Sequence, residues 1–278
     1  AKASNYTVAD TIGTLEVTTN TSDLAVAAAP VKVTYDGKAH SAVAAATLKG
    51  APTEATITYA DADGGYTLTE APSFTEAGTY TVAFKATKAG YADATGTTTV
   101  TITPATLTVT TPSASKVYDG TALTADGTIS GLVNGETATF ATTGTQTAKG
   151  SSDNTYSLTW DGTAKASNYT VADTIGTLEV TAANITDTAR FTVSQPADVV
   201  YNGLEQRQDV TVADSKTGED LAEGADYTLA YSDDATNVGT VTVTVTGTGN
   251  YAGEVVRTYQ ITPATLTVTT PSASKVSD

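Results

Sequence analysis

The sequence contains no cysteine and no methionine, and it has one histidine and one tryptophan in 278 residues. Without cysteine the chain can form no disulfide, and it offers no thiolate nucleophile and no cysteine ligand for zinc or an iron–sulfur cluster. A single histidine, His40, excludes multi-histidine metal sites and a Ser-His-Asp site shared by repeated units. No apolar run approaches the ~20 residues of a membrane span, and no stretch has the pattern of a signal peptide.

Positive charge is also scarce, with 14 Lys+Arg against 30 Asp+Glu and a formal net charge of −16. This acidic balance opposes nucleic-acid phosphate, so we expect no nucleic-acid partner. Hydrophobic residues make up 40% of the chain and charged residues only 16%. The chain is therefore too apolar and too weakly charged for disorder.

What is present is repetition. Residues 1–18 are identical to residues 164–181, and residues 104–117 recur at 263–276. The copies enclose a long period of about 160 residues, which holds two shorter units. We therefore predict an excerpt of a longer protein, in five parts. They are a C-terminal fragment of a preceding repeat (1–18), repeat 1 (19–103), repeat 2 (104–181), repeat 3 (182–262) and an N-terminal fragment of a following repeat (263–278).

Both end fragments carry an alternating apolar face, at Ile12, Leu15 and Val17 and at Leu266 and Val268. We expect residues 263–278 to supply an opening strand. Exposed strands add to other edges, so we expect the two ends to meet head to tail between molecules.

Two tyrosine motifs recur in the shorter units. The first is a Tyr-Asp/Asn-Gly turn, and the second is a Tyr that follows Gly or Asn about 50–56 residues later. The motif residues are Tyr35, Asp36, Gly37 and Tyr91 in repeat 1, Tyr118, Asp119, Gly120 and Tyr169 in repeat 2, and Tyr201, Asn202, Gly203 and Tyr251 in repeat 3. We expect a structural role, in which each ring packs at an end of its domain and its hydroxyl finds a backbone partner. A binding role is the alternative.

Period-2 alternation predicts strands throughout the repeats. Residues 239–247 place three valines on one face and Thr on the other. At the same place in their units, Phe84 and Trp160 are expected to face inward, with Trp160 largely buried. The Ala-rich stretch 42–51 lacks helix caps and occupies a strand position, so we predict a strand there.

Short strands and frequent turns within units of about 80 residues are typical of an immunoglobulin-like sandwich. We therefore predict an all-β chain of tandem Ig-like β-sandwich domains that form an elongated rod. Pro104 and Pro263 stand at the joins between units. Because proline fixes φ and restrains the residue before it, we expect semi-rigid joins.

Three sequence patterns carry a family resemblance: VTYDGKAH…GTYTV…AGY in repeat 1, KVYDGTALTADGTISGLVNGETATF…SNYTV in repeat 2, and YNGLEQRQDVTV…GTGNY in repeat 3. They resemble the Tyr-Asp-Gly-bearing, Ig-like or mucin-binding-protein-associated (MBG-type) tandem repeats of bacterial cell-surface adhesins. The resemblance implies extracellular stalk modules on a Gram-positive cell wall that carry a binding head. It associates no catalytic residue with the pattern, so we expect no enzyme, no cofactor and no metal site.

Two functions compete. A spacer would bury nearly all its aromatic rings, whereas a multivalent weak binder of mucin glycans or host proteins needs Trp or Tyr facing solvent. We expect a monomer whose partners are adjacent repeats, with a host mucin or surface protein as the further candidate and no membrane insertion.

The sequence also contains two candidates for rarer chemistry, a calcium loop and an internal amide cross-link. Residues 61–65 resemble the start of a calcium loop but lack its remaining ligands. Lys116 and Asn168, with Glu136 as the catalytic carboxylate, could form an internal amide cross-link. Repeats 1 and 3 have Val33 and Val199 where Lys116 stands.

Overall fold

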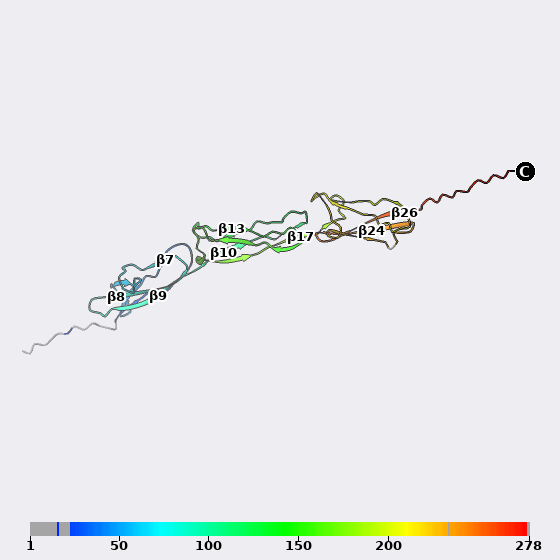
Figure 1. The fold of residues 1–278 in the computed structure, drawn as a ribbon. Coiled ribbons are helices and arrows are strands. Elements are labelled where there is room, and N and C mark those ends of the chain that lie inside the picture. Colours follow the sequence, from blue (N-terminus) through cyan, green and yellow to red (C-terminus); the bar gives the residue numbers. More distant parts are fainter. Residues whose placement is uncertain (1–15, 17–22, 233, 277–278) are drawn as a thin grey trace, which may run out of the picture. The chain divides into compact units, whose positions relative to one another are not determined.

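The structure is a computed structural model that describes Glu16, residues 23–232 and residues 234–276 (Figure 1). Within these residues the chain is all-β apart from one short 3-10 helix, η2 (Ala166–Asn168). The predicted Ig-like β-sandwich fold is confirmed. The predicted fragment 1–18 and its apolar face lie outside the described residues, except for Glu16. No helix in the described part of the chain is long and apolar enough to cross a membrane.

Repeat 1 forms two main sheets. Its strands are β1 (Leu24–Ala27), β2 (Val31–Thr34), β3 (His40–Ser41), β4 (Ala45–Leu48), β5 (Ala51–Pro52), β6 (Thr56–Tyr59), β7 (Ser73–Phe74), β8 (Gly78–Thr87) and β9 (Ala94–Thr103). One sheet has the order β1-β4-β5 and the other β2-β9-β8-β6, and β3 pairs with β7. The Ala-rich stretch therefore contains a strand, β4, as predicted.

The core of repeat 1 lies between these sheets. Leu24 and Ala46 from the first sheet pack with Ala86 from β8 of the second. Val82 and Phe84 are buried on the same face of β8, because alternate residues of a strand point the same way.

Repeat 2 distributes its strands over three small sheets. The strands are β10 (Ala105–Thr110), β11 (Ala114–Val117), β12 (Thr128–Ser130), β13 (Thr139–Thr142), β14 (Gly150–Asp153), β15 (Tyr156–Thr159), β16 (Tyr169–Thr174) and β17 (Thr177–Thr181). The sheet orders are β12-β10-β16, β11-β17-β14 and β13-β15. On β10 the buried residues Ala105, Leu107 and Val109 alternate with exposed Thr.

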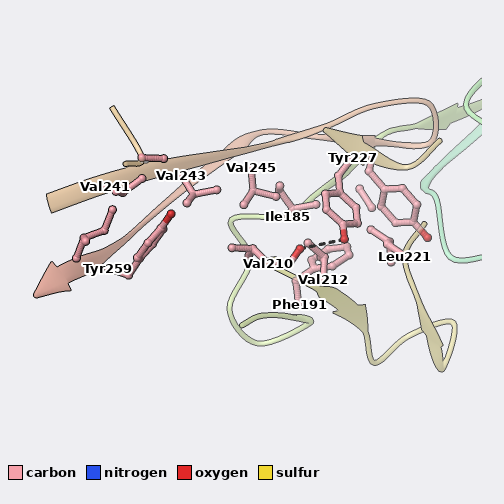
Figure 2. Packing of buried hydrophobic residues seen from close by; sticks show 14 residues of the cluster. Ile185, Phe191, Val210, Val212, Leu221, Tyr227, Val241, Val243, Val245 and Tyr259 are labelled. Carbon is pink, nitrogen blue, oxygen red and sulfur yellow. Dashed lines mark hydrogen bonds between the residues drawn. The ribbon is translucent and has the colours of Figure 1, made fainter. Parts of the chain in front are cut away.

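Repeat 3 repeats the two-sheet plan. Its strands are β18 (Ala183–Asn184), β19 (Phe191–Val193), β20 (Val199–Val200), β21 (Val212–Asp214), β22 (Glu219–Asp220), β23 (Tyr227–Tyr231), β24 (Gly239–Gly247), β25 (Tyr251–Ala252) and β26 (Glu254–Thr262). The main sheets are β19-β21-β22 and β20-β26-β24-β23, and β18 pairs with β25. Figure 2 shows Phe191 and Val212 of the first sheet in one core with Val243, Val245 and Tyr259 of the second.

A parallel strand pair joins the beginning and the end of every repeat. An early strand of each repeat, which is β2, β11 or β20, lies beside the closing strand, which is β9, β17 or β26. Four residue pairs register in repeat 1, from Val31↔Val100 to Thr34↔Thr103, and four in repeat 2, from Ala114↔Leu178 to Val117↔Thr181. Repeat 3 has two, Val199↔Ile261 and Val200↔Thr262.

The chain divides into two compact units whose boundary falls inside repeat 2. The first holds the described residues up to Thr108 with Ser130–Thr139 and Thr159–Ala172, and the second holds Val109–Ile129, Phe140–Leu158 and the described residues from Asp173 on. The residues of each junction between consecutive repeats therefore belong to a single unit.

Two sequence predictions are wrong. Trp160 is only partly buried and stacks on Tyr169, because it lies just past the end of β15, where the sheet no longer covers it. Residues 263–276 contain no strand, and Leu266 and Val268 are exposed. The identical sequence forms β10 in repeat 2 because β12 and β16 flank it there.

Candidate functional site

The first tyrosine motif forms the same turn in every repeat. The Asp or Asn side chain accepts a hydrogen bond from the backbone N–H two residues later, which is an Asx turn. Donor and acceptor are Lys38 N and Asp36 (2.9 Å), Thr121 N and Asp119 (3.0 Å), and Leu204 N and Asn202 (2.8 Å). The glycines that follow, Gly37, Gly120 and Gly203, have φ of 71°, 78° and 82°, which favours glycine at this place.

Each motif tyrosine is also fixed by its backbone to the closing strand of its repeat. The N–H of Tyr35, Tyr118 and Tyr201 donates to the carbonyl of Thr103, Thr181 and Thr262, at 2.8 Å in each case. These threonines are the last residues of β9, β17 and β26. The motif therefore stands where the chain leaves the repeat.

The two tyrosine motifs meet at junction 1. We define this junction by Tyr35, Gly37 and Ala77 of repeat 1 and by Glu136, Asn168 and Tyr169 of repeat 2. Tyr35 and Tyr169 contact edge to face, with ring centroids 5.7 Å apart and an interplanar angle of 78°. Both rings are buried. The first motif of one repeat thus packs against the second motif of the next.

A single carboxylate receives both hydroxyls of junction 1. Tyr35 donates to Glu136 Oε1 and Tyr169 donates to Glu136 Oε2, each at 2.5 Å. The Tyr169 hydroxyl also accepts the Val133 N–H at 3.0 Å, which is a backbone partner of the kind predicted. The Tyr35 hydroxyl departs from that prediction, because it donates to a side-chain carboxylate. Burial, reinforced by the hydrogen bond to Glu136, raises the pKa of Tyr35 and of Tyr169 to about 12.

Asn168 supplies the polar contact of junction 1. Its Oδ1 accepts the backbone N–H of Ala77 at 2.8 Å, and its Nδ2 donates to Glu76 Oε2 at 2.7 Å. Lys165 Nζ donates to the other Glu76 oxygen at 2.6 Å, and both of these charged side chains are exposed. A hydrogen bond from Lys165, and next the one from Asn168, lowers the pKa of Glu76.

Junction 2 has the same plan and is formed by Tyr118, Gly120 and Lys149 of repeat 2 with Thr217, Asn250 and Tyr251 of repeat 3. Tyr118 contacts Tyr251 edge to face, with centroids 5.5 Å apart at 84°, and Tyr251 meets Phe191 in the same way. Asn250 Oδ1 accepts the Lys149 N–H at 2.8 Å. Asn250 therefore does for Lys149 what Asn168 does for Ala77.

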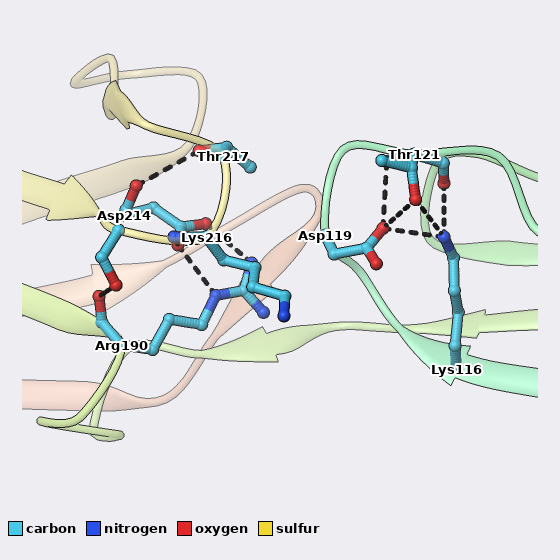
Figure 3. A network of polar contacts seen from close by, with 8 residues as sticks. Lys116, Asp119, Thr121, Arg190, Asp214, Lys216 and Thr217 are labelled. Atoms are coloured by element: carbon cyan, nitrogen blue, oxygen red, sulfur yellow. Dashed lines mark hydrogen bonds and ion pairs between the residues drawn. The ribbon is translucent and has the colours of Figure 1, made fainter.

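A buried ion pair lies beside junction 2 (Figure 3). Arg190 donates through Nε and Nη2 to the two oxygens of Asp214, at 2.8 and 2.7 Å, and the Asp214 side chain is fully buried. Burial on its own would raise the pKa of Asp214, but the hydrogen bonds from Arg190 and from the Lys216 N–H leave that pKa lowered. Burial, and next the charge of Asp214, raises the pKa of Tyr251 to about 12.

The motif glycines allow the close approach of the neighbouring repeat. A Cβ on Gly37 would lie 3.1 Å from Asn134 Cβ, and one on Gly120 would lie 3.2 Å from Thr217 Cγ2. Both contacts are tight, so a larger residue would push the loop of the next repeat away.

The remaining predicted residues lie outside these contacts. Tyr91 is partly buried against the Leu24 core of repeat 1, and Tyr201 is exposed. Sequence reasoning expected each tyrosine to serve its own repeat and missed Asn168 and Asn250 as junction residues. The signal was present, because an Asn directly precedes the second tyrosine in both repeats whose preceding repeat is described.

The structure gives the rarer features other roles. Lys116 Nζ donates to Asp119 and Thr121, and Asn168 bonds Glu76 and Ala77, so the nominated amide cross-link is not the observed pairing. Asp61 accepts hydrogen bonds from Thr67 and from neighbouring backbone N–H groups of its own turn. Among the described residues no group of three or more His, Cys, Asp or Glu is placed to hold a metal ion.

Comparisons with known proteins place one family within the chain. Residues 107–179, which lie within repeat 2, match the model of the MBG domain, YGX type, which confirms the resemblance to MBG-type repeats. No curated protein matches the chain.

Several solved structures of tandem domains are also similar. Sidekick-1 immunoglobulin domains 1–5 match at 11% identity and a TM-score of 0.33, over 87% of this chain and 59% of that one. Protocadherin Gamma B2 cadherin domains 1–5 match at 13% identity and a TM-score of 0.26, over 86% of this chain and again 59% of that one. The chain thus spans 59% of the length of each of these two structures.

Proposed function

We propose that this chain is a stalk segment of a bacterial surface adhesin, in which tandem β-sandwich repeats form an elongated rod that holds a binding head away from a Gram-positive cell wall. The proposal retains the predicted boundaries of repeats 1, 2 and 3 and assigns the chain no catalytic role. One observation carries it. At both junctions the motif tyrosines and the asparagine contact the neighbouring repeat, so these side chains are used in joining repeats.

The shape and association state of the 278-residue chain test the spacer role. Three repeats of about 30–40 Å each should give a rod on the order of 100 Å long. We expect small-angle X-ray scattering to report this length and light scattering to report a monomer. A compact scattering profile would overturn the rod, and a concentration-dependent mass would overturn the monomer.

The alternative, a weak multivalent binder of mucin glycans or host protein, draws on the partly buried ring of Trp160 and the 39% exposed Tyr201. Stacking on such rings would be lost in Trp160→Ala or Tyr201→Ala. We expect the unaltered chain to show no saturable binding to immobilised mucin. Saturable binding that either substitution abolishes would favour the binder over the spacer.

Cell-surface placement has its own test. Antibodies raised against the purified chain should label intact cells of the source bacterium and should lose that label after brief protease treatment. Labelling only after lysis would contradict a wall-anchored stalk.

A further inference from the structure

The end of repeat 3 that carries Tyr201 has the same backbone arrangement as the covered ends of repeats 1 and 2. Tyr201 is bonded to Thr262 as Tyr35 is to Thr103. Gly239 pairs with Ile261 as Gly78 pairs with Ile102. The residue before that glycine is Ala77 in repeat 1 and Val238 in repeat 3, so Val238 N–H takes the position of the amide that Asn168 binds.

Two side chains at this end, Tyr201 and Val238, are more exposed than their counterparts in junction 1. Tyr201 is 39% exposed, whereas Tyr35 is 5% exposed. Val238 is 52% exposed, whereas Ala77, at the same place in repeat 1, is partly buried. Val200 and Leu204 are exposed by 58% and 69%, and their counterparts Thr34 and Lys38 are exposed in junction 1 as well. A Cβ on Gly203 would meet no atom within 4 Å, although the same addition at Gly37 would meet Asn134 at 3.1 Å. An apolar surface with the geometry of a junction is therefore open at this end.

The chain sequence indicates what covers it. Thr262-Pro263-Ala264 repeats Thr103-Pro104-Ala105, and residues 263–276 are identical to residues 104–117. The chain that leaves repeat 3 thus begins as repeat 2 begins.

We propose that Tyr201, Gly203 and Val238, with Val200 and Leu204 at the margin, form a docking surface. Its partner is the end of a repeat-2-like repeat that carries the counterparts of Asn168 and Tyr169. This surface has the same backbone arrangement as the repeat 1 side of junction 1, where repeat 2 is the partner. The counterpart of Tyr169 packs edge-on against Tyr201, and the counterpart of Asn168 accepts the Val238 N–H. The inference depends only on the geometry of the junctions. It therefore holds whether the chain acts as a spacer or as a ligand binder.

The chemistry of the two faces is complementary. The Tyr201 end offers an aromatic ring, aliphatic side chains and a backbone donor. The partner offers a second ring, the amide oxygen of the Asn168 counterpart, and the carboxylate of the Glu136 counterpart as acceptor for the Tyr201 hydroxyl. Each donor in this pairing has an acceptor, which is the condition for burying polar groups without penalty.

The test extends the chain. Residues 1–276 are followed by a second copy of residues 118–181, and amide hydrogen exchange is compared with that of the 278-residue chain. We expect the amide of Val238 to exchange at least about tenfold more slowly in the extended chain. In the matched control, the copy's counterpart of Asn168 is replaced by Ala. Protection of the Val238 amide should then be lost, while the amide of Ala77 in junction 1 stays protected.

Three results would overturn the proposal. The first is unchanged exchange at Val238 although the fluorescence of the copy's Trp160 counterpart reports a folded copy. The second is a copy that stays unfolded beside folded repeat 3. The third is protection of Val238 in the 278-residue chain when its concentration is raised, which would assign the surface to a second copy of the whole chain.

Discussion

Junction 1 and junction 2 share a frame and differ in their charges. Both contain an edge-to-face tyrosine pair, an Asn bound to a backbone amide, and a glycine against a loop of the next repeat. Junction 1 adds Glu136, which accepts both tyrosine hydroxyls, whereas junction 2 is flanked by the buried Arg190–Asp214 pair. The tyrosine pair, the asparagine–amide hydrogen bond and the glycine contact are therefore common to both junctions. The charged groups differ, and they should determine how the stability of each junction changes with pH and salt.

The largest effect is expected where the charge is most deeply buried. Arg190→Ala leaves the carboxylate of Asp214 buried without its cation, so the free energy of unfolding should fall by about 3–5 kcal/mol. Urea unfolding followed by circular dichroism measures this change. The matched control is Arg207→Ala, since Arg207 pairs with Glu205 at the surface of the same repeat. Equal losses in the two variants would show that burial does not set the value of the pair.

Alkaline pH should weaken junction 1. The pKa of Tyr35 and of Tyr169 is about 12 in the folded chain and about 10 when unfolded. The folded state therefore holds more protons above pH 10, and stability that is complete below pH 10 is lost as pH rises toward 12. The loss at pH 12 should be about 2 kcal/mol for each of the two tyrosines.

Fluorescence of Trp160 provides the readout for this pH effect, because that ring stacks on Tyr169. Urea midpoints are compared between pH 8 and pH 12. Tyr35→Phe should flatten the decline, and Tyr118→Phe, in junction 2, is the control. An identical decline in the unaltered chain and in Tyr35→Phe would contradict the role of the shared carboxylate.

Substitution of the junction asparagines should lower the free energy of unfolding by an intermediate amount, and by more in junction 1 than in junction 2. Asn168→Ala removes the acceptor of the Ala77 amide and the donor to Glu76, at a cost of about 1–3 kcal/mol. Asn250 is less buried, so Asn250→Ala should cost less. Amide exchange should rise at Ala77 in the first variant and at Lys149 in the second. A rise spread evenly over a whole repeat would point to general destabilisation instead.

The smallest effect is expected at the exposed ion pair of junction 1. Lys165→Ala removes the partner of Glu76, but both side chains face solvent and are screened by salt. The urea midpoint should stay within measurement error at 1 M NaCl. A clear loss that persists at that salt concentration would mean that Lys165 contributes through packing.

The sequence predicted local structure well because local structure depends on local patterns. The alternation of residues 239–247 became β24, and the Asx turn at Asp36 follows from the hydrogen-bonding habit of that side chain. The pairing of Tyr35 with Tyr169 could not be read in this way. Those residues are far apart in the chain and belong to different repeats, so only the folded ends bring them together.

Identical sequences also form different structures at two places in the chain. Residues 105–110 form β10, whereas the same letters in the 263–276 stretch form no strand, because flanking strands supply the backbone partners only in repeat 2. The prediction that Trp160 is largely buried is wrong for a related reason. Its alternation is correct, but its position one residue beyond β15 removes the cover that the pattern assumes.

The parallel pairing of an early strand with the closing strand of each repeat has a mechanical consequence. If the chain is pulled from both ends, the first residue of β2 and the last residue of β9 are drawn in opposite directions along parallel strands. The hydrogen bonds between them are then loaded together in shear instead of one after another. Repeat 3 has the shortest such clamp, Val199↔Ile261 and Val200↔Thr262, so it should yield at the lowest force. Extension under load would then begin at the repeat whose Tyr201 end is open.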